Sequence, residues 1–219
     1  MDLESGVRRR LTNGPSGNGG GVWSPDGSRI AFSADRTHQA DLYEKAVNGS
    51  VSEHPLLEAE GQKLVCDWSS DGRYLLYWER EPRGLGRFGL MALPMFGDRK
   101  PIVIMEPASR EDFRAKFSPD GRWIAYATDE AGRSEVFVTS FPAATEKWQV
   151  SSAGGTMPYW RRDGRELFSS RSTEISWPYR FPRGSPLRRA FRSRSSRPSL
   201  RGSRRPSFTT PRRTASVSC

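Results

Sequence analysis

Histidine and cysteine are scarce, with two of each among 219 residues. Cys66 and Cys219 provide neither the framework of a disulfide-rich domain nor the paired spacing of a zinc site. His38 and His54 fall in expected surface loops, and no Gly-x-Ser-x-Gly elbow accompanies them. The sequence therefore predicts no catalytic residue and no metal site, and we expect the chain not to be an enzyme.

Two further features are missing. The glycine-rich stretch at 18–21 lacks the Lys-Ser/Thr pair of a phosphate-binding loop, so no cofactor is predicted. No apolar run reaches the length of a membrane span, and residues 1–4 lack the basic and then apolar layout of a signal peptide. As written, the chain is expected to be cytoplasmic. It would be periplasmic if an export signal had been lost from its start.

The positive charge is confined to one end of the chain. Residues 169–219 contain 13 arginines and one acidic residue, Glu174, whereas residues 1–168 contain 22 basic and 24 acidic side chains. The terminal segment is rich in Arg, Ser and Pro and has no periodicity, which predicts a disordered tail. Such a tail would bind polyanions without specificity, because no recognition helix or nucleic-acid-binding fold accompanies it.

One short pattern occurs four times along the chain. An aromatic residue precedes a Ser/Pro-rich turn, an Asp-Gly pair follows, and an alternating apolar run comes next, at residues 23–32, 68–77, 117–126 and 160–168. The aspartates are 45, 49 and 43 residues apart, a spacing found in propeller blades and helical solenoids.

Each copy has the chemistry of a β-hairpin. Aspartate can accept hydrogen bonds from the backbone ahead of it, and glycine accepts the positive φ of a turn exit. Turn-forming roles rather than metal or acid-base roles are therefore predicted for the repeated pairs Asp26 and Gly27, Asp71 and Gly72, Asp120 and Gly121, and Asp163 and Gly164. The alternating runs after these turns predict half-buried strands, and each unit yields four of them.

Aromatic residues recur at matched positions and are predicted to form a core between units rather than a ligand cage. They are Trp23, Phe32, Trp68, Tyr77, Phe117, Tyr126 and Trp160.

The repeat divides the chain into units. We expect the end of an incomplete unit at 1–13, full units at 14–60, 61–108 and 109–153, the start of another at 154–168, and the tail at 169–219. A closed propeller of six or seven units would need more chain, so the sequence is expected to be a truncated propeller with exposed edges.

The pattern Trp/Phe-Ser-Pro-Asp-Gly-x-x-Ile-Ala-Phe/Tyr, followed by a strand such as 134–138, closely resembles the WD40-like, TolB-type β-propeller repeat of bacterial proteins. The resemblance covers about residues 1–168. Ser70 replaces the proline of the second copy, and Arg161-Arg162 replaces Ser-Pro in the fourth. The resemblance implies an all-β partial propeller of four-stranded antiparallel blades.

The end of the repeat at Phe168 suggests a second hypothesis about the tail. Codons permitted for residues 170–181, read from one nucleotide upstream, can encode LSIDGDLMAVPV, which restores an Asp-Gly turn and an alternating strand. Two later stretches, 190–198 and 209–217, can encode propeller-like sequences in the same frame. We therefore hypothesise a frameshift after about residue 168, which would leave the tail without a selected function.

The fold alone predicts a scaffold. The leading hypothesis is a non-catalytic, TolB-like module that binds a protein or peptide through the loops at 35–40, 80–87 and 129–134. The resemblance also implies two alternatives. The chain could be the gating propeller of a prolyl-oligopeptidase-type serine peptidase whose catalytic domain is absent, or a sensor-domain fragment of a bacterial Ser/Thr kinase or regulator.

Overall fold

The structure, a computed structural model, describes residues 11–12, 18–36, 39–49, 52–82, 86–109, 114–130, 132–171, 174–175 and 179–180. All regular secondary structure in these ranges is β-strand, as the alternating apolar runs predicted. His38, most of the incomplete unit expected at 1–13 and most of the predicted tail lie outside the described residues.

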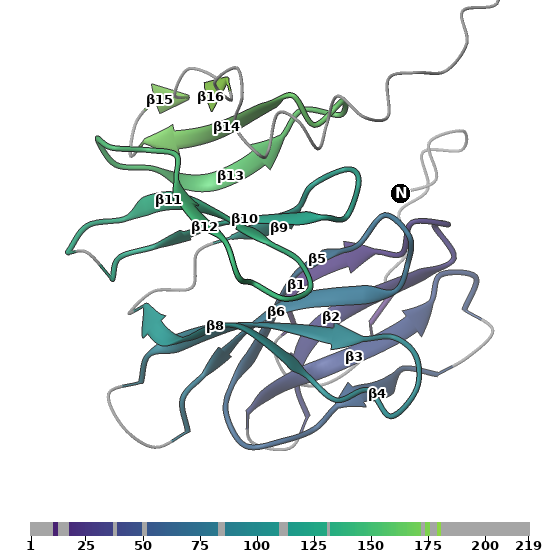
Figure 1. Cartoon of the computed structure of the whole chain (residues 1–219). Helices are drawn as coiled ribbons and strands as arrows, with labels where there is room; N and C mark the ends of the chain where they lie inside the picture. The colour runs from purple at the N-terminus through teal and green to yellow at the C-terminus, as the bar shows by residue number, and fades with distance from the viewer. Residues whose placement is uncertain are drawn as a thin grey trace, which may run out of the picture.

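The strands form four antiparallel sheets in chain order (Figure 1). The first sheet contains β1 (Asn18–Trp23), β2 (Arg29–Asp35), β3 (Ala40–Ala46) and β4 (His54–Leu57). The second contains β5 (Lys63–Trp68), β6 (Tyr74–Arg80), β7 (Phe88–Pro94) and β8 (Ile102–Ser109). The third contains β9 (Ala115–Phe117), β10 (Trp123–Thr128), β11 (Glu135–Ser140) and β12 (Lys147–Gln149). In each of these three sheets, consecutive strands are neighbours.

The fourth sheet has a different arrangement. It contains β13 (Thr156–Trp160), β14 (Glu166–Arg171), β15 (Glu174–Ile175) and β16 (Tyr179–Arg180). Both two-residue strands, β15 and β16, pair with β14. Regular structure thus continues past Phe168, where the repeat pattern ends, into the first residues of the segment predicted to be a tail.

Three apolar clusters hold neighbouring sheets together. Leu42 and Ala31 of the first sheet pack with Trp68 and Tyr77 of the second. Leu76 and Trp78 belong to the cluster that joins the second sheet to the third, and Trp160 to the cluster that joins the third to the fourth. The sheets are therefore stacked face to face, as the blades of a propeller are.

Six of the seven predicted core aromatics are buried, and Trp23 is the exception. Trp68, Phe117 and Trp160 are 5 to 6% exposed, whereas Trp23 is 53% exposed. Each of the three buried residues packs against the preceding sheet, and within the described residues no sheet precedes β1. The same position of the repeat is thus buried or exposed according to its neighbour.

Hydrogen bonds also connect the first strand of the second, third and fourth sheets to the sheet before it. The Val65 amide donates to Ser33 Oγ at 2.8 Å, and the Phe117 amide donates to the Asp67 carboxylate at 2.9 Å. The Trp160 indole Nε1 donates to the Lys116 carbonyl at 3.1 Å. The strands β1, β5, β9 and β13 therefore lie next to one another at one edge of the stack, as contacts between consecutive members of this series also show.

Candidate functional site

The Asp-Gly pairs lie in the turns between the first two strands of each sheet. Asp26 accepts hydrogen bonds from Ser24 Oγ at 2.5 Å and from the Ser28 amide at 3.1 Å. These donors stabilise the carboxylate and lower the pKa of Asp26 to about 2. Gly27 has φ of 71° and donates its amide to the Ser24 carbonyl.

The other three turns have the same geometry. Asp71, Asp120 and Asp163 each accept a hydrogen bond from the amide two residues ahead, at 3.0, 3.2 and 3.0 Å. The glycines that follow have φ between 69° and 75°. Each carboxylate is used inside its own turn, and among the described residues no group of three or more His, Cys, Asp or Glu side chains could hold a metal ion.

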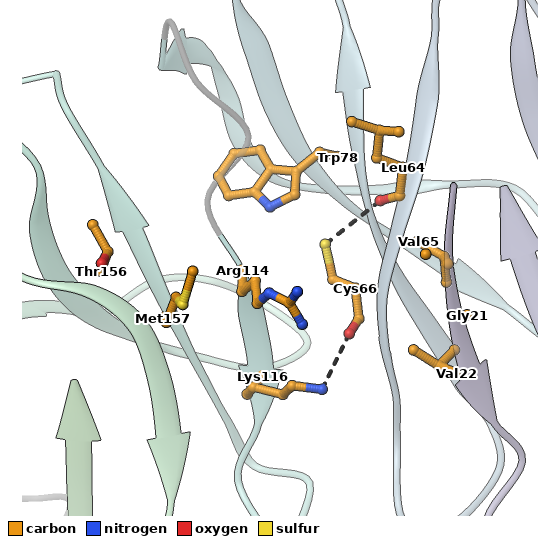
Figure 2. Close-up of a pocket in the computed structure, with 11 residues that line it drawn as sticks. Gly21, Val22, Leu64, Val65, Cys66, Trp78, Arg114, Lys116, Thr156 and Met157 are labelled. Carbon is orange, nitrogen blue, oxygen red and sulfur yellow. Dashed lines mark hydrogen bonds between the residues drawn. The ribbon is translucent and has the colours of Figure 1, made fainter. Parts of the chain in front are cut away.

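A cavity of about 460 Å³ lies where the first strands of the four sheets meet (Figure 2). Its lining consists of Gly20, Gly21, Val22, Leu64, Val65, Cys66, Trp78, Arg114, Lys116, Thr156 and Met157. All of these except Trp78 fall in the four residues before the anchor aromatic of a repeat copy. The cavity is therefore built from equivalent positions of the four units.

Local irregularity of the strands shapes the cavity. The pairing register shifts at Gly20 in β1, at Cys66 in β5 and at Met157-Pro158 in β13. Gly20 and Met157 have positive φ, 47° and 50°. Such bulges bend a strand and re-aim its side chains, so the bulged residues border the cavity instead of continuing the flat sheet.

The cavity lies toward the end of the blades that carries the predicted binding loops. Asn18 at the start of β1 pairs with Ala34 near the end of β2, and Lys63 of β5 pairs with Glu79 of β6. The first residues of the inner strands thus lie beside the loops at 35–40 and 80–87. By the same antiparallel pairing, the loop at 129–134 follows β10 at this end. The structure describes these loops only in part.

Lys116 and Asp67 form an ion pair beside the cavity. Lys116 Nζ donates to Asp67 Oδ1 at 2.8 Å and to the Cys66 carbonyl at 3.2 Å. Burial raises the pKa of Asp67, and the ammonium of Lys116 opposes this effect. The pair joins the second sheet to the third and fixes the position of Lys116.

Cys66 is a free thiol in the cavity wall. Its Sγ contacts the Leu64 carbonyl at 3.5 Å. Burial raises the pKa of Cys66 to about 12, so the thiolate form is rare at neutral pH. This environment favours a structural role for the thiol over a nucleophilic one.

His54, the histidine that the structure describes, lies on β4. Its Nε2 is 2.9 Å from Glu44 Oε1, and Glu44 also pairs with Arg29 at 3.0 Å. His54 does not line the cavity.

Within the described ranges, no helix has the length and apolarity needed to cross a membrane.

The cavity could not be predicted from the sequence. The equivalent positions in the four copies hold Gly20, Val65, Arg114 and Met157, which share no chemistry. The one available signal was an arginine in a repeat position that is apolar or glycine elsewhere.

Sequence comparison with known proteins finds a relative that matches a short part of the chain. No protein-family model matches the sequence. An uncharacterized protein of Agrobacterium fabrum is 41% identical over 68 residues, which is 31% of this chain and 22% of that protein.

Solved structures of propeller proteins are similar in fold. A protein assigned as TolB from Agrobacterium tumefaciens matches with a TM-score of 0.60 and 18% identity, over 70% of this chain and 55% of that one. TolB from Acinetobacter baumannii matches with a TM-score of 0.60 and 16% identity, over 73% and 39%. Prolyl oligopeptidase B from Galerina marginata matches with a TM-score of 0.52 and 13% identity, over 68% and 23%.

This chain spans only about half, or less, of the length of the TolB chains that it matches. Four antiparallel sheets, stacked in chain order around a shared inner edge, account for the match. The described chain therefore has the all-β fold of a TolB-like β-propeller.

Proposed function

We propose that this chain is a non-catalytic scaffold that binds a protein or peptide segment at the cavity end of its blades. The observation that carries the proposal is the cavity of about 460 Å³ formed by equivalent positions of four inner strands. Concave sites with mostly apolar walls and a few polar groups are typical of ligand-binding sites.

The surroundings of the cavity support a peptide-sized ligand. Met157 and Tyr159 on β13 are 57% and 66% exposed. The loops at 35–40, 80–87 and 129–134 follow the second strands of three sheets at this same end. A bound segment would contact apolar side chains at the cavity and polar side chains in the loops, as in many interfaces with an apolar centre and a polar rim.

A random-peptide library selected against the full chain tests the proposal. The selected peptides are then compared on two variants, Met157→Trp, which fills the cavity, and Phe96→Trp, which adds bulk at a similarly exposed residue outside it. We expect Met157→Trp to weaken binding at least about ten-fold, because the larger side chain occupies the apolar space that the peptide would contact. Phe96→Trp should leave binding unchanged. Equal binding to both variants, or no enriched peptide, would contradict the proposal.

A further inference from the structure

Most polar groups around the cavity already have partners. Lys116 is held by Asp67, and the Cys66 thiol contacts the Leu64 carbonyl. Thr156 Oγ1 lies 3.2 Å from both the carbonyl and the hydroxyl oxygen of Ser170. These groups do not require a hydrogen bond or an opposite charge from a ligand.

Two side chains differ from the others, and both are donors. Trp78 is 1% exposed, and its buried Nε1 has no hydrogen-bond partner. Arg114 lies just before β9 and is exposed, and its guanidinium makes no ion pair or hydrogen bond with another residue that the structure describes. In Figure 2 the indole nitrogen of Trp78 and the guanidinium of Arg114 point toward the same space, beside Cys66.

This pairing determines the chemistry of a suitable ligand. An indole N–H and a guanidinium can only donate hydrogen bonds, so the ligand must supply acceptors. A buried donor without a partner costs free energy, which an acceptor would recover. The guanidinium adds a positive charge and a planar fork that matches a carboxylate.

A carboxylate fits the cavity better than a phosphate does. Arg114 is the one lining cation without an acidic partner among the described residues, because Lys116 is neutralised by Asp67. One net positive charge balances a monoanion, whereas phosphate at neutral pH carries up to about two negative charges and three acceptor oxygens. Val22, Val65 and Met157 supply apolar walls beside the donors.

We propose that the cavity binds a carboxylate group between the Arg114 guanidinium and the Trp78 indole N–H. The carboxylate can come from the C-terminus of a peptide or from an acidic side chain. This inference rests on the proposed peptide-binding function and names the group that the cavity takes.

The indole N–H signal of Trp78 in the full chain gives a direct test by NMR. Comparison with Trp78→Phe assigns the signal, and N-acetyl-leucine and the α-amide of N-acetyl-aspartate are the C-terminal and side-chain carboxylate probes. N-acetyl-leucinamide is the uncharged control. We expect a saturable shift of this signal with at least one carboxylate probe and none with the amide, because the amide offers no charge to Arg114.

Arg114→Gln should weaken binding of the carboxylate probe by about ten-fold or more, the usual effect of losing a charged hydrogen bond. Arg122→Gln, an exposed arginine in the Asp-Gly turn of the same sheet, is the matched control and should leave the affinity unchanged. The remaining indole signals report whether the variants keep their fold.

Three outcomes would overturn the inference. They are no shift with either carboxylate, an equal shift with the amide or with inorganic phosphate, and an unchanged affinity in Arg114→Gln. The peptide selection with Met157→Trp is independent of these results. If selected peptides bind the cavity but Arg114→Gln has no effect, the carboxylate site is wrong and the proposed function stands.

Discussion

The ammonium of Lys63 lies 2.9 Å from the carboxylate of Asp41, although Lys63 is fully buried. Lys63 begins the second sheet and Asp41 lies on β3 of the first, so the ion pair connects two blades. The Gly61 carbonyl accepts a further hydrogen bond from Lys63 Nζ at 2.7 Å, and the Ala59 carbonyl also accepts one. Lys63 therefore binds both β3 of the first sheet and the segment that connects β4 to β5.

Lys63→Met should destabilise the chain by about 3–5 kcal/mol, because it leaves the buried Asp41 carboxylate without its partner. Urea unfolding followed by tryptophan fluorescence measures the change in the free energy of unfolding. The double variant Lys63→Met, Asp41→Leu should recover part of the loss, since it removes both charges. A loss below about 1 kcal/mol in the single variant would show that water or another group compensates the charge.

The matched tryptophans of the repeat test how the blades pack. Trp160→Ala should cost about 3–5 kcal/mol, because Trp160 is 5% exposed between the third and fourth sheets. Trp23→Ala should cost about 1 kcal/mol or less, because Trp23 is 53% exposed. Thermal unfolding of the two variants gives the comparison. Similar losses would show that Trp23 is buried in solution by a surface that the structure does not describe.

Acid should weaken the turn at Asp26. The folded pKa of about 2 lies below the ordinary value of 3.8, so the charged carboxylate stabilises the fold above about pH 4. This contribution is lost as the pH falls from about 4 toward 2. The melting temperature of the parent chain should therefore exceed that of Asp26→Asn at pH 7, and the difference should shrink toward zero near pH 2. Asp98→Asn, at an exposed aspartate paired with Lys100, is the control and should show a smaller difference than Asp26→Asn at pH 7.

Cys66 should react slowly with thiol reagents while the chain is folded. Its pKa of about 12 keeps the thiolate fraction near one in 10⁵ at pH 7, since each pH unit changes the ratio ten-fold. In a Cys219→Ser background, the rate of labelling should rise steeply with pH and increase on unfolding in urea. Rapid labelling at pH 7 under native conditions would contradict the burial of the thiol in the folded chain.

The repeat made the fold predictable. Asp-Gly turns and the alternating runs after them carry local signals, so the order of strands in the first three sheets follows from the sequence. The resemblance to TolB-type repeats pointed to the same architecture. The exposure of Trp23 could not be predicted from the local sequence, because it depends on whether another sheet packs against this residue.

The cavity and the buried ion pair could not be predicted in this way. A register shift of one residue at Cys66 leaves no mark in the apolar pattern, yet it decides which side chains reach the cavity. A lysine such as Lys63 is usually exposed, and its burial depends on Asp41 in another sheet. The continuation of β14 to Arg171 was also missed, because the repeat pattern ends before it.

The shifts at Gly20, Cys66 and Met157 separate each of these inner strands into two parts. The part after the shift carries the aromatic anchor and pairs regularly with the second strand. The residues that border the cavity lie at or before the shift in β5 and β13, and at or after it in β1. Substitutions at these lining positions can therefore change what the cavity recognises while the anchor and the turn stay intact. Tandem copies of one unit can in this way evolve a new specificity at their shared centre without losing the framework that they have in common.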